Sequence, residues 1–301
     1  MSNKLAYDSI SHLLPLFHQP WWLDAVCEGE WDVVLVKEKD EIVAVWPYQI
    51  EKKWGFNIVR NPLLTPYLGP FLLKGNPQEL VLDLWQQLPK ADMIQWSFLP
   101  DLKTPTFILA KGIISSDKYT YYIDLSQTIE LIWANIHPKR KNAIRKAEQD
   151  LELRKEPLNL PLFVEWHRLA FTEKGKSYPF TVSFFEKIVQ QAALNSSSTA
   201  YAAYDDTGLC VGMIWLAFDA EKMYYLLSAT PAKTHRGAIA LLLWSAIREA
   251  KGMGLLTFDF EGSVDEGIAH FFQRFGGVKM SFTDNMLVRS PLWKLKQKIL
   301  G

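Results

Sequence analysis

The sequence predicts an α/β protein in which one α/β unit occurs twice, the second copy following the first by roughly 160 to 170 residues. Residues 31–50 predict two alternating strands around a charged turn. Residues 198–218 repeat this pattern around a turn at residues 205–208. The two halves share the order of their predicted elements but little residue identity. Duplication of one unit explains this order, and ordinary α/β alternation is the other explanation.

The elements that follow each hairpin come in the same order in both halves. Periodicity predicts a helix and then a strand, at residues 78–88 and 93–98 and again at 238–251 and 255–260. Glycine turns at residues 107–112 and 271–277 precede alternating strands at 119–125 and 281–288. We therefore expect a first domain at residues 1–126 and a second at residues 127–301, each a mixed, mostly antiparallel sheet flanked by helices, with residues 291–301 packing back on the first domain.

Composition restricts the class of protein. No uninterrupted apolar run approaches the ~20 residues that cross a membrane, and the first residues lack the pattern of a signal peptide. We therefore expect a soluble, cytoplasmic protein whose cysteines, Cys27 and Cys210, stay reduced. Lys and Arg number 33, as do Asp and Glu, so the whole surface is not that of a general nucleic-acid binder, and DNA is not expected as a partner.

A local basic segment opens the predicted second domain. In residues 137–156, HPKRKNAIRKAEQDLELRKE, five cations occur before the first acid. Helical spacing places Ile136, Ala143, Ile144 and Ala147 along one side, while the cations spread over the others. A solvated helical face is one explanation, and a phosphate-binding surface formed by Arg140, Lys141 and Arg145 is the other.

The segment LIWANIHPKRKNAIRKAEQDLELRKE resembles the one that opens the second domain of Fem-type peptidoglycan bridge-forming aminoacyltransferases. The later segment LLLWSAIREAKGMGLLTFDFEGSVDEGIAHFFQRFGG is similar to that family and to the wider GNAT (N-acyltransferase) superfamily. The resemblance covers roughly residues 120–290. It implies a tandem GNAT-like fold, because Fem-type proteins consist of two GNAT-like units.

The loop before the helix at residues 238–251 is a candidate donor-binding site. Backbone N–H groups at a helix N-terminus bind phosphates, and glycine permits close backbone approach. The superfamily's acyl-CoA loop reads Q/R-x-x-G-x-G/A, whereas this chain has K-T-H-R-G-A-I-A. The candidate residues here are Lys233, His235, Arg236, Gly237 and Ala238. The alternative is that the glycine and the cations serve only to begin the helix and bind no donor.

Two acids follow in FDFEGS, residues 258–263. Strand alternation predicts that Asp259 and Glu261 share one face. An ammonium must lose a proton before it attacks a carbonyl, so either acid could act as a base or orient an incoming amine. The alternative is a capping or loop-ordering role, and Ser263 could cap the following helix.

The segment at residues 271–276 departs from the Fem pattern F-K-x-x-F-G. Phe272 stands where that pattern has the lysine associated with the reaction centre, so the lysine's role does not transfer. Arg274 could supply positive charge from another turn of the helix.

The remaining polar and aromatic residues give weaker signals. The histidines His12, His18, His167 and His270 form no metal-ligand spacing, so no metal is expected. The tryptophans Trp21, Trp22, Trp46 and Trp54 are expected in the core or at a domain interface. Tyr67, in the loop at residues 61–71, is a candidate for a substrate cleft, and the loop at residues 172–180 could close over a substrate.

The predicted function is transfer of an acyl or aminoacyl group, from an activated ester or thioester, to an amine on a phosphorylated acceptor such as a cell-wall precursor. No tightly bound cofactor is expected; acyl-CoA or aminoacyl-tRNA would be the donor substrate. The alternatives are an acyl-CoA-dependent acetyltransferase of a soluble metabolite and an inactive GNAT-like binding module. For the latter, the tail SPLWKLKQKILG is weakly amphipathic and could contact a membrane surface peripherally.

Overall fold

The computed structural model describes residues 2–100, 102, 112–262 and 266–300, the last four of them by backbone alone. It divides into two compact units. Unit 1 comprises Met1–Tyr119 with Met280–Gly301, and unit 2 comprises Thr120–Lys279. Unit 2 is thus an insertion in the chain of unit 1, whereas the predicted repeat boundary lies at residue 126/127. The glycine turn predicted at residues 107–112 falls almost wholly outside the described residues.

Unit 1 contains two sheets. The first has the order β1-β2-β5, made of Asp32–Glu38, Glu41–Tyr48 and Phe71–Leu72. The second has β3 (Ile50–Lys53), β4 (Phe56–Val59), β6 (Met93–Ser97) and β13 (Val278–Val288) as consecutive neighbours. The helices of unit 1 are α1 (Asn3–Asp8), α2 (Pro20–Val26), α3 (Pro77–Gln87) and α10 (Pro291–Leu300), with 3-10 turns η1 (Ser11–Leu13) and η2 (Leu16–His18).

Aromatic side chains form much of the unit 1 core. Trp46 and Trp96 are buried and pack with Trp85, at centroid distances of 5.0 to 6.0 Å. Trp22 is also buried and donates its indole N–H to Thr65 at 3.0 Å. Trp54 differs from the prediction: its side chain is 58% exposed, because it occupies the tip of the β3–β4 hairpin.

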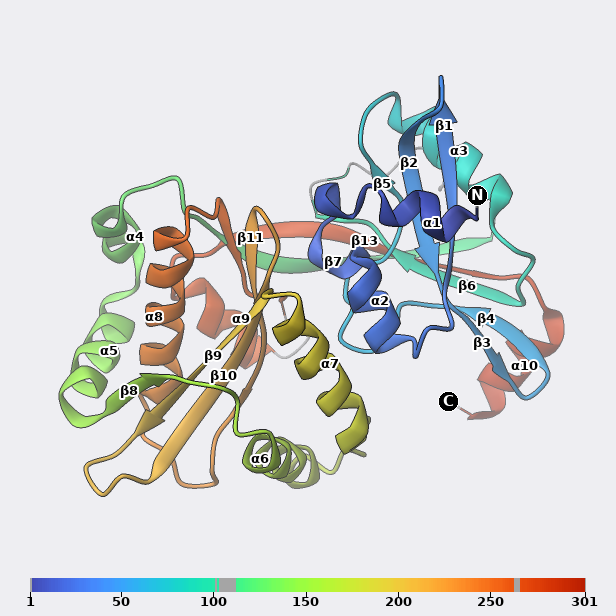
Figure 1. The fold of residues 1–301 in the computed structure, drawn as a ribbon. Helices are drawn as coiled ribbons and strands as arrows, with labels where there is room; N and C mark the ends of the chain where they lie inside the picture. Colours follow the sequence, from blue (N-terminus) through green and yellow to red (C-terminus); the bar gives the residue numbers. More distant parts are fainter. Residues whose placement is uncertain (1, 101, 103–111, 263–265, 301) are drawn as a thin grey trace. The chain divides into compact units, whose positions relative to one another are not determined.

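Unit 2 has a sheet whose strands follow the order β7-β12-β11-β10-β9-β8 (Figure 1). These strands are β7 (Ile113–Asp124, beginning in unit 1), β8 (Glu152–Lys155), β9 (Ser198–Tyr204), β10 (Cys210–Phe218), β11 (Lys222–Ala229) and β12 (Thr257–Asp259). The helices are α4 (Ile129–Asn135), α5 (Pro138–Asp150), α6 (Leu160–Glu173), α7 (Val182–Leu194), α8 (Ala238–Gly252) and α9 (Glu266–Gln273). Pairing is antiparallel except between β11 and β12.

Helices α6 and α8 cover opposite faces of this sheet. Successive strand residues point to opposite faces. Gly212 on β10 faces Ala238 and Ile239 of α8, whereas its neighbour Met213 packs with Phe163 and Trp166 of α6. The α6 face is the one that carries the cavity described below.

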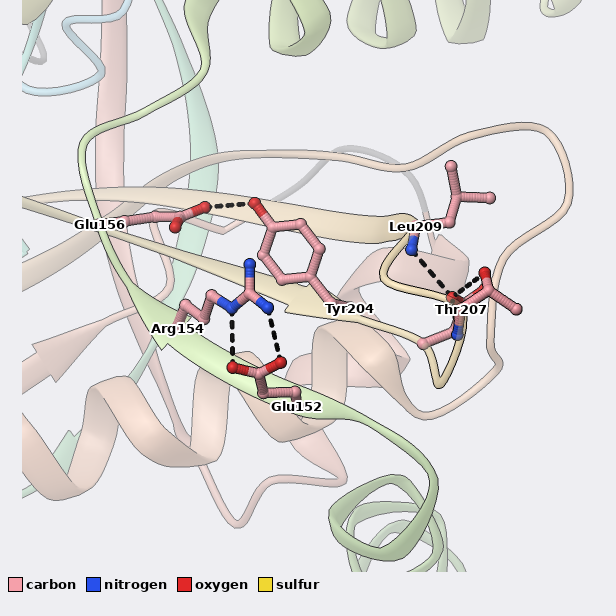
Figure 2. A network of polar contacts seen from close by, with 7 residues as sticks. Glu152, Arg154, Glu156, Tyr204, Thr207 and Leu209 are labelled. Carbon is pink, nitrogen blue, oxygen red and sulfur yellow. Dashed lines mark hydrogen bonds and ion pairs between the residues drawn. The ribbon is translucent and has the colours of Figure 1, made fainter.

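The free edge of the sheet, strand β8, is covered by a polar network (Figure 2). Arg154 donates two parallel hydrogen bonds to Glu152, at 2.8 and 2.6 Å, and lies 4.1 Å above the Tyr204 ring. Tyr204 in turn donates to Glu156. Charged side chains along an edge oppose pairing with another chain, so this network protects the sheet end.

The N-terminus of α8 lies directly against helix α5. A Cβ atom built on Gly237, which precedes α8, would lie 2.5 Å from the Ala143 carbonyl oxygen and 2.9 Å from the Ala147 Cβ. Ile144 and Ala147 of α5 are fully buried, as their spacing predicted. Glycine at position 237 is thus required for the packing of two helices.

Replacing Gly237 with alanine should therefore destabilise the protein by roughly 1–3 kcal/mol, because the new methyl group overpacks the α5–α8 contact. Urea unfolding measures this change. The matched control is Gly252→Ala, at the other end of α8, where an added Cβ meets nothing within 4 Å. That control should be neutral or stabilising by up to about 1 kcal/mol; equal losses in both variants would contradict the packing role of Gly237.

Candidate active site

The parallel strands β11 and β12 separate at one end. Their pairing runs from Lys222↔Thr257 to Tyr224↔Asp259, where β12 ends. Strand β11 continues to Ala229, paired with β10 on its other side. Beyond Tyr224, the β12 side of β11 thus has no strand partner among the described residues, which leaves backbone N–H and C=O groups available to a ligand.

A cavity of about 530 Å³ lies at this separation, within unit 2. One wall is formed by β11 residues 225–229 with Thr230, and another by residues 260–262. Trp166, His167 and Phe171 of α6 close it from a third side, and Ile268 and Phe272 of α9 from a fourth. Lys174 and Lys176, after the end of α6, lie at its edge. The lining combines apolar and aromatic side chains with polar and charged ones, a mixture that can both bury and orient a small molecule.

Glu261 is the acid in the cavity wall. It follows the end of β12 in the left-handed region, with φ 58°, and its half-buried carboxyl has an Oε1 atom with no hydrogen-bond partner in the described structure. Burial, with a further contribution from the Asp259 charge, raises the pKa of the Glu261 carboxyl well above its usual range. A carboxyl with a raised pKa at a cavity surface is suited to accept a proton near neutral pH.

Asp259 stabilises the turn at Glu261 through its hydrogen bonds. It is fully buried, and its Oδ1 accepts from the Thr120 hydroxyl and, at 2.7 Å, from the N–H of Glu261. The predicted strand alternation does not relate the two acids, because β12 ends at Asp259 and the left-handed turn redirects Glu261. Asp259 is therefore placed to position Glu261, and it does not line the cavity.

His167 lies between the cavity and an aromatic cluster. Its ring stacks near Phe163 and Phe180, and its Nδ1 is 3.3 Å from the Tyr178 hydroxyl. Burial lowers the pKa of His167 to about 4, so the imidazole is neutral at pH 7. Asn159 and Thr181, whose side chains accept from Leu162 and Phe184 N–H groups, begin helices α6 and α7 and so position this cluster.

The predicted donor-binding loop lies beside the cavity. Thr230 and Ile239, on either side of this loop, line the cavity, whereas residues 233–238 do not. His235 is 3.1 Å from Asp150 of α5 and accepts from the Gly237 N–H at 3.2 Å, and no side chain caps α8. Lys233 and Arg236 are exposed. Their binding of a donor, with Ala238, stays a prediction.

The predicted anion-binding cations separate into two groups. Arg140 stacks 3.9 Å above the Phe271 ring and has a buried Nε without a hydrogen-bond partner. Burial and the nearby Arg274 charge lower the pKa of Arg140. Lys141 donates to the Ala134 carbonyl at 2.8 Å, and Arg145 lies 5.6 Å from the Trp133 ring. Arg140 and Arg274 thus form one group, and Lys141 and Arg145 form a second one near the Trp133 ring.

Two further sequence candidates are placed by the structure. Tyr67 belongs to unit 1, where its buried ring packs edge-on against Phe17 and Phe282; its role in substrate binding stays a prediction. Phe272, at the lysine position of the Fem pattern, is buried and stacks on Phe260 at 4.7 Å. The cavity thus has an aromatic surface at that point.

Sequence reasoning did not single out Trp166, His167 or Tyr225 as cavity residues. The spacing of Trp166 and Phe163 on a predicted helix indicates burial, but which face of the sheet that helix covers depends on tertiary packing. The loop at residues 172–180 was noted as a possible cover, and its Lys174 and Lys176 do line the cavity.

The sequence of residues 136–271 matches the profile of the Acetyltransferase (GNAT) domain. Among solved structures, FemX is similar over 98% of both chains, with a TM-score of 0.75 at 14% identity. The C-terminal domain of a putative lysylphosphatidylglycerol synthetase from Agrobacterium fabrum is similar over 99% of this chain and 96% of that one (TM-score 0.59, 13% identity). A tandem GNAT protein from the clavulanic acid biosynthesis pathway is similar over 85% and 82% (TM-score 0.52, 11% identity).

No curated protein sequence gives a significant match. The structural matches show the fold of a GNAT acyltransferase, and the sequence match places a GNAT acetyltransferase domain at residues 136–271. More particularly, its fold is the Fem-type tandem GNAT fold, which confirms the predicted fold class.

Neither a membrane-spanning helix nor a metal cluster occurs in the described parts of the chain. None of the helices there is both long and apolar enough to cross a bilayer. In the same residues, no group of three or more His, Cys, Asp or Glu side chains could hold a metal ion.

The lowered pKa of His167 predicts a pH dependence of stability. The folded state keeps His167 neutral down to about pH 4, whereas the unfolded chain takes up a proton near pH 6.5. His167 therefore makes its full contribution to the free energy of unfolding above pH 6.5. This contribution, at most about 3 kcal/mol, is lost as the pH falls towards 4. In urea unfolding, His167→Gln should lose less stability over this range than the parent protein.

His18 in unit 1 provides an internal reference for the same urea-unfolding experiment. Burial also lowers the pKa of His18 to about 4, so the His167→Gln variant should keep the share of the pH dependence due to His18. If the free energy of unfolding depends on pH equally in the variant and in the parent protein, the fold does not hold His167 neutral.

Proposed function

We propose that this protein is an N-acyltransferase that transfers an acyl group from an activated thioester or ester to an amine within the unit 2 cavity. The observation that carries the proposal is the separation of β11 from β12, with the Glu261 carboxyl at the cavity surface. Direct attack of the amine on the carbonyl needs no covalent protein intermediate. Positioning, proton removal and stabilisation of the oxyanion suffice.

The unpaired edge of β11 supports an extended, amide-bearing donor. Its backbone N–H and C=O groups can pair with such a chain as a neighbouring strand would. One of its N–H groups, directed at the reacting carbonyl, would stabilise the oxyanion. The first turn of α8 has N–H groups without intrahelical acceptors, and Lys233 and Arg236 lie beside it. Acyl-CoA combines an amide-bearing arm with phosphates and is the donor that we favour.

Glu261 is proposed as the proton acceptor. As the amine nitrogen bonds to the acyl carbon, its surplus proton passes to the Glu261 carboxylate, and the thiolate leaves with the electron pair of the broken C–S bond. The raised pKa makes Glu261 a stronger base than an exposed glutamate. Asp259 keeps the turn in its left-handed conformation by accepting from the Glu261 N–H.

The acceptor is proposed to be an amine that carries a phosphate. The Arg274 charge is close enough to lower the pKa of Arg140, and no ion pair among the described residues neutralises either guanidinium. Bringing two guanidinium groups together costs free energy that a bound phosphate would offset. Phe271 fixes the guanidinium of Arg140 by stacking.

Aminoacyl-tRNA is the second candidate donor, on the ground of the fold shared with FemX and the cations of α5. A cell-wall precursor is the acceptor that would accompany it. The aromatic Phe272 at the lysine position favours acyl-CoA instead. Thermal shift distinguishes the two donors, because only a ligand of the native state raises its stability.

Glu261→Gln should lower kcat by about 10²- to 10⁴-fold, since an amide cannot accept the proton. In the parent protein, kcat/KM should rise with pH as Glu261 loses its proton, and its raised pKa places this rise above the usual glutamate range. The variant should lack that rise. The measurement is release of coenzyme A from acetyl-CoA with a panel of amino sugars, amino acids and polyamines.

The matched control for this experiment is Glu266→Gln, an exposed acid in the first turn of α9, which should keep both rate and pH profile. Glu261→Gln should still show a thermal shift with acetyl-CoA, which separates loss of chemistry from loss of folding. Donor binding without turnover of any amine in the parent protein would favour a GNAT-like binding module.

The double variant Arg140→Gln/Arg274→Gln should weaken binding of inorganic pyrophosphate at least about tenfold, because it removes charge-assisted hydrogen bonds to the anion. Titration followed by thermal shift measures this change. Arg248→Gln, at an exposed position on α8, is the control and should bind as the parent does. Unchanged pyrophosphate binding in the double variant would refute the phosphate subsite while leaving the acetyl-CoA result intact.

A further inference from the structure

The tip of the β3–β4 hairpin in unit 1 carries an unusual tryptophan. Trp54 and Gly55 form a two-residue turn with φ of 53° and 82°. Turns of this kind favour Asn and Gly, since a bulky side chain in the left-handed region is unfavourable. Trp54 occupies this position and still exposes 58% of its surface. Its contacts within unit 1, with the Trp293 ring at 6.3 Å and with the Lys53 and Lys296 ammonium groups, thus leave more than half of its surface exposed.

Helix α10 lies beside this hairpin in unit 1 (Figure 1). Trp293 anchors the helix: it is buried, packs against Phe56 at 5.1 Å and donates to the Met93 sulfur. With Trp293 turned inwards, Leu292 and Leu295, three residues apart, share an outer face and are 69% and 58% exposed. The Lys296 ammonium lies 3.7 Å above the Trp54 ring and so joins this face to the hairpin tip.

Basic residues surround these apolar side chains. Lys53, 4.8 Å from the Trp54 ring, comes from β3, and Lys296 comes from α10. Glu51 is paired with Arg60, and Asp92 accepts from the Asn57 N–H, so both nearby acids are engaged. We call Trp54, Leu292, Leu295 and these two lysines the Trp54 surface. It has an apolar centre and a basic rim.

We propose that the Trp54 surface binds the surface of a lipid bilayer that contains anionic lipids. Indole rings favour the headgroup region, where an apolar ring and a polar N–H are both accommodated. Leu292 and Leu295 would enter the boundary with the acyl chains, and lysines at the rim would contact lipid phosphates. This composition fits a bilayer better than a protein partner, because lysine is depleted at protein–protein interfaces.

The test is cosedimentation of the full-length protein with vesicles. The parent protein should bind phosphatidylcholine vesicles containing about 30% phosphatidylglycerol, and pure phosphatidylcholine vesicles at least about tenfold more weakly. Trp54→Ser/Leu295→Ser should reduce binding at least about tenfold through loss of apolar burial. Lys53→Gln/Lys296→Gln should reduce it and flatten its salt dependence.

Controls separate this effect from general hydrophobicity and from misfolding. Leu194→Ser/Leu209→Ser removes two leucines of unit 2 that are 70% and 63% exposed, and this variant should bind as the parent does. Circular dichroism should show every variant folded. Absence of vesicle binding by the parent, equal binding by the Trp54 variant, or loss of self-association instead of vesicle binding would each overturn the proposal. The acetyl-CoA thermal shift does not depend on this result.

Discussion

The parallel pairing of β11 with β12 lasts for only three residue pairs, and the buried carboxylate of Asp259 determines where it stops. One oxygen of Asp259 accepts from Thr120 on the neighbouring strand and from the N–H of Glu261 beyond the strand end. Phe260 still donates its N–H to the Tyr121 carbonyl of β7, and at Glu261 the left-handed turn takes the chain out of the sheet. The free edge of β11, the cavity and the position of Glu261 all depend on this turn.

The elements of unit 2 around this turn form the cavity walls and hold the start of α8 in position. Helices α6 and α9 supply apolar walls, and the close α5–α8 contact at Gly237 holds the start of α8 beside the cavity. An apolar wall lowers the local dielectric, which raises the pKa of Glu261 and strengthens any hydrogen bond made to a reacting carbonyl. Burial of the Glu261 carboxyl thus costs folding stability, but it makes this group a stronger base for the proton transfer that we propose.

Much of the fold could be predicted because it rests on local patterns. Strand β6 and helix α8 begin and end within a residue of their predicted bounds, since periodicity and turn residues act over short distances. Glu261 was a candidate by residue type and strand alternation, whereas the structure brings it to the cavity wall through a left-handed turn that alternation does not predict. Its catalytic role stays a prediction.

Other features depended on tertiary placement. Trp54 was expected in the core or at a domain interface because tryptophan is usually buried, and the K-W-G-F turn lacks the Asn or Asp that marks a hairpin tip. His167 gave no sign of its cavity position, since that depends on which sheet face α6 covers.

The insertion of unit 2 within the chain of unit 1 has a consequence for biosynthesis. All residues of unit 2 are contiguous, so the emerging chain can complete its sheet as soon as residue 279 has left the ribosome. Unit 1 is started first but finished last, because β6 lacks its partner β13, and Met93 lacks Trp293, until the final segment is synthesised. During translation, the N-terminal part of the protein therefore waits, with an open sheet edge and an uncovered apolar cluster, while the later part folds.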